Sequence, residues 1–262
     1  MKVVNCLKSF IKEALEEDKA RRDLTTSGLR ISGLKIKAVI YARQKGILCG
    51  LDIAKEVFTS LGEVKWVSNF KDGMYFKNGE KIACLEGKAK IILGAERVAI
   101  NILSHLSGIS TFTGKFVNVV ANNRIKIYDT RKTTPLMRKL EKYAVRVGGG
   151  YNHRMNLSDA LMIKDNHISA FRKKYKKEDY MFKMIEVLRN KYPAKELIVE
   201  VHNLAEWMQV IEAKPDVIMF DNWNAENIKV ALKMLKKKKF EIEISGSIRL
   251  KQLEKIIKLG VN

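Results

Sequence analysis

Hydrophobic positions in the first hundred residues follow helical spacing in some segments and strand-like alternation in others. A helical stripe over residues 5–17 contains Leu7, Phe10, Ile11, Ala14 and Leu15. A second helix is predicted over residues 51–61. The strands are predicted over residues 34–42, 46–49, 64–67 and 81–85. The chain is therefore predicted to begin with a small α+β unit.

From residue 95 to about residue 120 the pattern is helical, and beyond it short β-branched runs alternate with helical stretches. The predicted strands cover residues 125–128, 160–163, 197–201, 217–220 and 241–244. The predicted helices cover approximately residues 168–191, 204–213, 225–237 and 249–259. This alternation favours parallel strands wrapped by helices.

Polar side chains stand at or just past the C-terminal ends of these five runs: Asp129, Lys164, Glu200, Asp221 and Ser245. In a βα barrel the active-site groups collect at that end of the strands. An open doubly wound sheet also binds ligands at its carboxyl edge, but at one switch point. Because five separate strands carry polar ends, a barrel is favoured. Cations beside two carboxylates suit a substrate with anionic groups and sugar hydroxyls, and a Mg²⁺ held mainly through substrate phosphates.

Four cations lie in one short region beside Gly, Asn, Asp or Thr rather than on a charged helix face: Arg131, Lys132, Arg154 and Lys164. A guanidinium binds a carboxylate or phosphate through two parallel hydrogen bonds, and a lysine adds a compact point charge. The region is therefore predicted to bind a small molecule with several negative charges.

The net charge of +21 comes from scattered lysines with few interleaved aromatics, so no specific nucleic-acid partner is expected. Cys6, Cys49 and Cys84 show no metal-ligand spacing with the histidines, so no zinc site is expected, and they are predicted to be reduced thiols of a cytoplasmic protein. No apolar run approaches the roughly 18 residues of a membrane span. Acidic residues near the N-terminus argue against a secretory signal.

Three motifs closely resemble those of the quinolinate phosphoribosyltransferase family, also called carboxylating nicotinate-nucleotide pyrophosphorylases: Asp129-Thr-Arg-Lys-Thr-Thr-Pro135, Asn152-His-Arg154 and Ile163-Lys-Asp-Asn-His167. Further matches extend over nearly the whole chain and are looser in the first hundred residues; among them are Asp23-Leu-Thr-Thr26, Ala95-Glu-Arg97, Val199-Glu-Val201, Phe220-Asp-Asn222 and Ser245-Gly-Ser247. Leu136 and Ser247 depart from the family, which usually has glycine at both positions.

The resemblance implies an N-terminal α/β sandwich domain, residues 1–107, followed by an incomplete, TIM-like α/β barrel, residues 108–262. Family members continue past the equivalent of Gly260-Val-Asn262 through a further strand and a phosphate-binding loop. That last strand and loop are therefore expected to be missing from this chain.

The implied reaction transfers phosphoribosyl from phosphoribosyl pyrophosphate to quinolinate with Mg²⁺ and decarboxylation, giving nicotinate mononucleotide, pyrophosphate and CO₂ in NAD biosynthesis. Lys132, Glu200 and Asp221 are expected to be catalytic. The expected substrate-binding residues are Arg97, Thr130, Arg131, Lys132, His153, Arg154, Lys164, Glu200, Asp221, Ser245, Gly246 and Ser247. Arg97 is expected to reach the site of a neighbouring subunit, which implies a dimer or a hexamer.

Three other functions stay open at this point. One is a related pentosyltransferase that acts on another acidic ring, and another is a homologue that binds quinolinate without turnover. The third is a nucleic-acid-binding protein that uses the net charge of +21. The role of His153 is also open, since histidine serves equally well in proton transfer and in structural hydrogen bonding.

Overall fold

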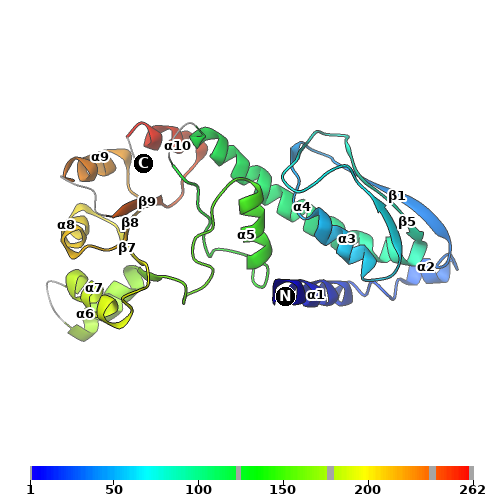
Figure 1. The fold of residues 1–262 in the computed structure, drawn as a ribbon, viewed down its shortest axis with the longest axis horizontal. Helices are drawn as coiled ribbons and strands as arrows, with labels where there is room; N and C mark the ends of the chain where they lie inside the picture. Colours follow the sequence, from blue (N-terminus) through cyan, green and yellow to red (C-terminus); the bar gives the residue numbers. More distant parts are fainter. Residues whose placement is uncertain (1, 122–124, 176–179, 236–239, 260–262) are drawn as a thin grey trace. The chain divides into compact units, whose positions relative to one another are not determined.

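The computed structural model describes residues 2–121, 125–175, 180–235 and 240–259 and divides into two compact units (Figure 1). The N-terminal unit comprises residues 1–117 and 133–152, and the C-terminal unit residues 118–132 and 153–262. The domain boundary between residues 107 and 108 stays a prediction. Among the described residues, no helix is both long and apolar enough to cross a membrane.

The N-terminal unit contains a three-stranded antiparallel sheet in the order β1 (Lys35–Tyr41), β5 (Lys81–Lys88) and β3 (Val64–Val67). A second antiparallel pair joins β2 (Gly46–Ile47) to β4 (Tyr75–Phe76). The helices with residues in this unit are α1 (Lys2–Glu17), α2 (Leu24–Gly28), α3 (Leu51–Thr59), α4 (Ala89–Val120) and α5 (Arg138–Val147).

Apolar side chains from these helices and strands form one core, in which Ala54, Val57, Ala99 and Leu106 are completely buried. Burying a valine or leucine side chain contributes about 1.5–3 kcal/mol, so this core holds the helices against the sheet. The structure confirms the predicted helices near residues 5–17 and 51–61 and the strands near residues 34–42, 64–67 and 81–85. Strand β4 and helix α5 were not predicted.

The C-terminal unit is built on a parallel sheet in the order β6 (Leu161–Ile163), β7 (Leu197–Val201), β8 (Val217–Asp221) and β9 (Glu241–Ser245). Its helices are α6 (Asp165–Tyr175), α7 (Tyr180–Lys191), α8 (Leu204–Ala213), α9 (Ala225–Lys233) and α10 (Leu250–Ile257). In Figure 1, α8 and α9 lie along the outer side of β7, β8 and β9. This arrangement confirms the predicted incomplete, TIM-like α/β barrel.

Alternation along the strands separates the two faces of this parallel sheet. Val199, Val201, Ile218 and Phe220 join a core with side chains of the helices, including Trp207 of α8. The residues between them, Ile198, Val217 and Met219, form a separate small cluster with Ala160. The first face is covered by helices, so the second is the inner face, toward which Glu200 also points by the same alternation.

Two predictions about elements of the C-terminal unit were wrong. Residues 125–128 form no strand; only Tyr128 makes an isolated bridge, because so short a run depends on its pairing partners rather than on its own propensity. In place of the single helix predicted over residues 168–191 the structure describes two helices, α6 and α7, and residues 176–179 of that prediction lie outside the described residues. Residues 236–237, at the end of the helix predicted over 225–237, and the chain end at 260–262 lie outside the described residues.

Candidate active site

Parallel pairing brings the polar strand ends of the C-terminal unit to one edge of its sheet. Lys164 directly follows β6, Asp221 ends β8, and Ser245 ends β9 opposite Asp221. Glu200, in β7, pairs with Met219, which in turn pairs with Glu243 of β9. Residues that face one another across parallel strands point to the same side, so Glu200 and Glu243 share the inner face.

Five residues at this edge are connected by side-chain contacts and are together called the carboxylate group: Lys164, Glu200, His202, Asp221 and Ser245. The Lys164 ammonium bonds the buried Glu200 carboxylate. His202 Nε2 lies 3.6 Å from Glu200 Oε1, and its Nδ1 lies 4.0 Å from Asp221 Oδ2. The Ser245 hydroxyl donates to Asp221 Oδ1 at 2.9 Å.

His202 was missed by sequence reasoning, which discounted it as a ligand because no metal-binding spacing surrounds it. In the structure, one ligand atom each from Glu200, His202 and Asp221 lie within 4.8 Å of one another. The available signal was its place two residues after Glu200, just beyond β7. Carboxylate oxygens suit hard cations such as Mg²⁺, and an imidazole adds affinity for transition metals.

A tight turn follows β9 at Gly246, whose φ of 112° lies in the left-handed region. A Cβ at this position would lie 2.3 Å from Asn222 Oδ1. The same Asn222 oxygen accepts the Ser247 N–H at 3.2 Å, and Asn222 Nδ2 donates to Asp221 Oδ2 at 3.0 Å. Asn222 therefore joins the ends of β8 and β9, and Gly246 is required because its neighbour leaves no room for a side chain.

A second set of residues in the C-terminal unit is called the arginine group: Asp129, Arg131, His153 and Arg154. The His153 N–H donates to Asp129 Oδ1 at 2.9 Å, which ties residues 129–131 to the Asn152-His-Arg154 motif. The Arg154 guanidinium donates to the Ala160 carbonyl at 3.2 Å. Burial and then the charge of Arg131 lower the pKa of Arg154, so the positive charge of Arg131 acts on the Arg154 guanidinium.

Glu243 was also missed by sequence reasoning. Its carboxylate lies 3.4 Å from His153 Nε2 on the inner face of the sheet. The contact shows that the arginine group meets the same face that carries Glu200, because Glu243 and Glu200 belong to one row of paired residues.

Thr130, Lys132 and Arg97 are predicted site residues that belong to neither of these two groups. Thr130 and Lys132 are exposed, and the Thr130 hydroxyl accepts the Lys132 N–H at 3.0 Å. Arg97 is exposed on α4 in the N-terminal unit, and its role at a neighbouring subunit stays a prediction. His167 accepts the Lys164 N–H at 3.1 Å through Nδ1, so in the Lys164-Asp-Asn-His167 motif it holds the start of α6.

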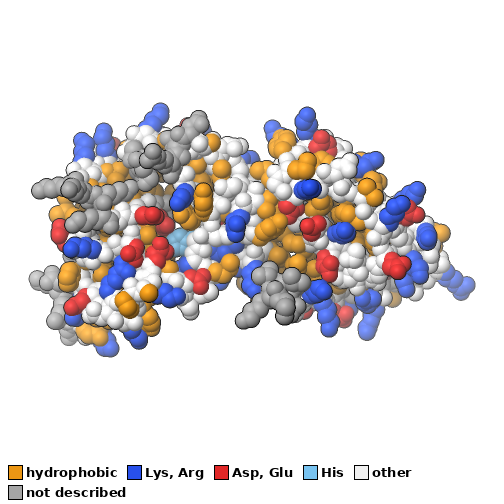
Figure 2. Space-filling model, in the orientation of Figure 1, with side chains coloured by type: hydrophobic (Ala, Val, Ile, Leu, Met, Phe, Trp, Pro, Cys, Tyr) orange, Lys and Arg blue, Asp and Glu red, His pale blue; other side chains and the backbone are white. Residues whose placement is uncertain are grey.

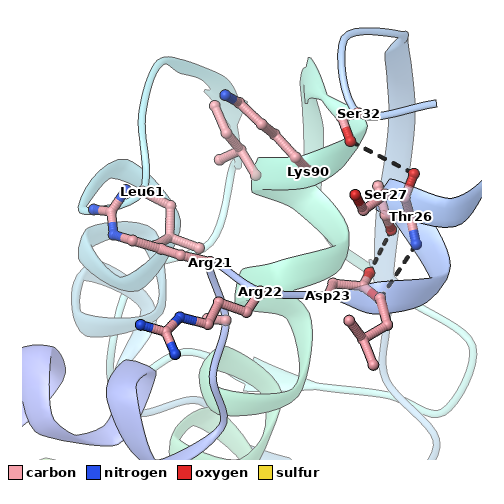
Figure 3. Close-up of a pocket in the computed structure, with 11 residues that line it drawn as sticks. Arg21, Arg22, Asp23, Thr26, Ser27, Ser32, Leu61 and Lys90 are labelled. Atoms are coloured by element: carbon pink, nitrogen blue, oxygen red, sulfur yellow. Dashed lines mark hydrogen bonds between the residues drawn. The ribbon is translucent and has the colours of Figure 1, made fainter. Parts of the chain in front are cut away.

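The Asp23-Leu-Thr-Thr26 motif lies in the N-terminal unit beside a pocket of about 450 Å³ that Arg21, Arg22, Leu61 and Lys90 help to line (Figure 3). Asp23 caps α2: it accepts the Thr25 N–H at 2.9 Å, the Thr26 N–H at 3.3 Å and the Thr26 hydroxyl. Because all these bonds satisfy the first turn of α2, the motif has a structural explanation. None of the predicted substrate-binding residues lines this pocket.

On the face shown in Figure 2, the Lys and Arg side chains of the described residues are scattered over both units and form no single large patch. Lys164, among the cations predicted from the sequence, instead directly follows the strand β6.

Family models match both parts of the chain: the C-terminal domain of quinolinate phosphoribosyl transferase over residues 109–262 and its N-terminal domain over residues 23–107. The chain belongs to the quinolinate phosphoribosyl transferase family.

Relatives of this family align over almost the whole chain. A probable carboxylating nicotinate-nucleotide pyrophosphorylase from Methanocaldococcus jannaschii is 38% identical over 97% of this chain and 89% of that protein. The Bacillus subtilis protein of the same name is 39% identical over 98% of this chain and 86% of its own length. The solved nicotinate-nucleotide pyrophosphorylase of Francisella tularensis superposes with a TM-score of 0.88 at 35% identity, covering 98% of this chain and 89% of that one.

Proposed function

We propose that this protein is a quinolinate phosphoribosyltransferase, which joins quinolinate to phosphoribosyl pyrophosphate and releases pyrophosphate and CO₂ to form nicotinate mononucleotide. One observation supports the proposal most directly. Glu243 lies on the same inner face of the parallel sheet as Glu200 and contacts His153, so the arginine group and the carboxylate group lie at one face. Family membership supports the same activity.

The arginine group suits the pyridine diacid. Arg131 and Arg154 lie close enough that the charge of one lowers the pKa of the other, a repulsion that a bound dianion relieves. A guanidinium also matches a carboxylate geometrically through two parallel hydrogen bonds. Lys132 directly follows Arg131 in the sequence. It adds a third positive charge for the substrate carboxylates or the ribosyl phosphate.

The carboxylate group suits the sugar and its metal. Glu200 and Asp221 accept hydrogen bonds from ribose hydroxyls, and Mg²⁺ commonly binds one or two carboxylates together with substrate phosphates. Mg²⁺ at these two residues, with His202 beside them, would supply charge neutralisation for the departing pyrophosphate. When substrate binds, the Lys164 ammonium exchanges its bond with Glu200 for one with the substrate. The turn at Ser245, Gly246 and Ser247 offers hydroxyl and N–H donors to a phosphate.

The chemistry needs mainly positioning and fixed charge. The pyridine nitrogen bonds to the anomeric carbon while the carbon–oxygen bond to pyrophosphate breaks, so positive charge develops on the ribose and negative charge on the leaving group. Ribosylation leaves a positive ring nitrogen. As CO₂ departs, the electron pair of the broken carbon–carbon bond stays on the ring carbon next to this nitrogen, whose positive charge stabilises it, and a proton then bonds to that carbon. Preorganised charges stabilise such steps without an additional organic cofactor.

Assembly and location are part of the proposal. Arg97 is exposed on α4, as a residue lent to a neighbouring site must be, so a dimer or a hexamer is proposed. The buried Cys49 and half-buried Cys84 are free thiols, consistent with a reducing cytoplasm.

The test is formation of nicotinate mononucleotide from quinolinate, phosphoribosyl pyrophosphate and Mg²⁺, with CO₂ release measured in parallel. Arg154→Lys keeps the charge but loses the paired donors, so the KM for quinolinate should rise at least tenfold. Lys183→Met removes a half-exposed cation of α7, which pairs with Glu186, and serves as the control, with unchanged kinetics.

Other outcomes separate the alternative functions. Product from another heterocyclic acid, but none from quinolinate, would identify a related pentosyltransferase. Calorimetric binding of quinolinate with no pyrophosphate release would identify a homologue without turnover.

A further inference from the structure

The imidazole of His153 is engaged by the protein at both nitrogens. Nδ1 accepts the backbone N–H of Arg154 at 2.7 Å, and Nε2 lies 3.4 Å from the Glu243 carboxylate. An Nδ1 that accepts a hydrogen bond carries no proton, so the proton of the neutral ring is on Nε2 and points toward Glu243. The ring is nine-tenths buried, with a side-chain exposure of 11%.

This arrangement argues against proton transfer by His153. Protonation at Nδ1 would break the bond from Arg154, and Nε2 already carries a proton that faces Glu243. A general base needs a free lone pair within reach of the substrate proton. The ring is held further by the edge of Tyr128, whose centroid lies 6.2 Å away.

Glu243 is the residue that holds this ring in place. It lies within β9, whose register with β8 gives its side chain a defined direction, and its side chain is only 20% exposed. Glu196 and Glu241 act on the same neighbour as Glu243, because burial and then the negative charges of all three carboxylates raise the pKa of Tyr128. The negative charge near His153 therefore does not come from Glu243 alone.

We infer that Glu243 is a positioning residue that acts through His153 on the peptide of Arg154. The chain of contacts runs from the Glu243 carboxylate to Nε2–H, through the ring to Nδ1, and on to the Arg154 N–H. Asp129 holds the other side by accepting the His153 N–H at 2.9 Å. The backbone of residues 153–154 is thereby held on both sides, and the Arg154 guanidinium keeps its direction.

The inference rests on the proposed function, in which Arg154 binds a substrate carboxylate. Loss of Glu243 should then weaken quinolinate binding more than turnover. The KM for quinolinate is expected to rise about tenfold in Glu243→Ala, while kcat stays within about threefold. The KM for phosphoribosyl pyrophosphate should change little.

Three variants of the whole chain make the test sharp. Glu243→Gln keeps an acceptor for Nε2–H and should restore the quinolinate KM to nearly the wild-type value. His153→Asn keeps an acceptor near the Nδ1 position but lacks Nε2, and should resemble Glu243→Ala. Glu254→Gln, which changes an exposed carboxylate of α10, is the matched control. Circular dichroism melting identifies any variant that fails to fold.

Nitrogen NMR of the wild-type protein gives an independent readout, since Nδ1 of His153 should be unprotonated and Nε2 protonated. A proton on Nδ1, or an unchanged quinolinate KM in folded Glu243→Ala, overturns the inference. A collapse of kcat in His153→Asn with loss of one limb of the pH profile also overturns it, because that result identifies proton transfer. If the wild-type enzyme forms no product from quinolinate, the proposed function fails instead, and the NMR result still decides the tautomer.

Discussion

Lys164, just past β6, pairs with the buried carboxylate of Glu200 in the neighbouring strand β7. Two charges that lie on adjacent strands, from segments far apart in the sequence, thus neutralise one another on the inner face of the sheet. An unpaired buried carboxylate is costly, so the lysine offsets the cost of burying the charge of Glu200.

Lys164→Met should therefore lower the free energy of unfolding as well as activity. Glu200 has a side-chain exposure of 6% and would lose its lysine partner. The expected cost is about 1–3 kcal/mol by urea denaturation, since the lysine itself is half-exposed. The double variant Lys164→Met/Glu200→Gln should recover most of that loss while remaining inactive. Strict additivity of the two single changes would contradict the pairing.

Gly246→Ala should damage the turn after β9. The φ of 112° is unfavourable for alanine, and the new Cβ would lie 2.3 Å from Asn222 Oδ1. The turn must shift, so the KM for phosphoribosyl pyrophosphate is expected to rise more than tenfold in steady-state assays. Gly73→Ala in the N-terminal unit is a useful control, because its φ is 91° but its Cβ meets no atom within 4 Å. Equal kinetic effects of both substitutions would disprove the role of Asn222.

Glu141 should make the stability of the protein sensitive to acid. Burial raises the pKa of this carboxyl, but bonds from Thr134 and from His105, at 2.9 Å, outweigh it, so the net pKa lies below 4.5. A group with a lowered folded-state pKa contributes stability above its unfolded value, here 4.5, and loses it as the pH falls through the folded-state pKa.

Urea denaturation at a series of pH values measures this contribution. The loss of stability of the wild type below pH 4.5 should be shallower in Glu141→Gln, which cannot titrate. Glu254→Gln, on the exposed surface of α10, should leave the slope unchanged. A wild-type slope in Glu141→Gln would show that other groups dominate.

Cys49 should resist thiol reagents while the protein is folded. Burial raises the pKa of this thiol to about 12, so at pH 8 only about one molecule in ten thousand carries the reactive thiolate. Cys84 is half-buried and should react faster. Peptide mass spectrometry after iodoacetamide treatment, with and without urea, distinguishes the two sites. Equal labelling of both in the native protein would contradict the burial of Cys49.

Local patterns were enough to predict much of the fold and part of the site. The β-branched runs around Val199, Ile218 and Ile242 became parallel strands, because apolar side chains there are buried on the helix-covered face. Polar residues at the ends of those runs could be predicted to meet, since parallel strands present the same end at one edge. Arg131 and Arg154 were predicted to converge on one anion. In the structure burial and then the charge of Arg131 lower the pKa of Arg154, and the shared role of the two residues in binding stays a prediction.

His202 and Glu243 show where such patterns fail. Neither residue belongs to a recognisable metal-ligand spacing in the sequence. The role of each depends on the side chains that it contacts in the folded chain. The failed strand over residues 125–128 has a similar cause, since a strand exists only if another segment supplies its ladder.

By itself, the order of residues determined most of the helices and strands, the polar residues that end the parallel strands, and the family to which the chain belongs. Only the tertiary structure decided which charges neutralise one another, that His202 stands between two carboxylates, and that Glu243 holds His153. Periodicity and strand-end chemistry are properties of a short segment, whereas an ion pair depends on strand register and loop path, which are settled when distant segments pack together.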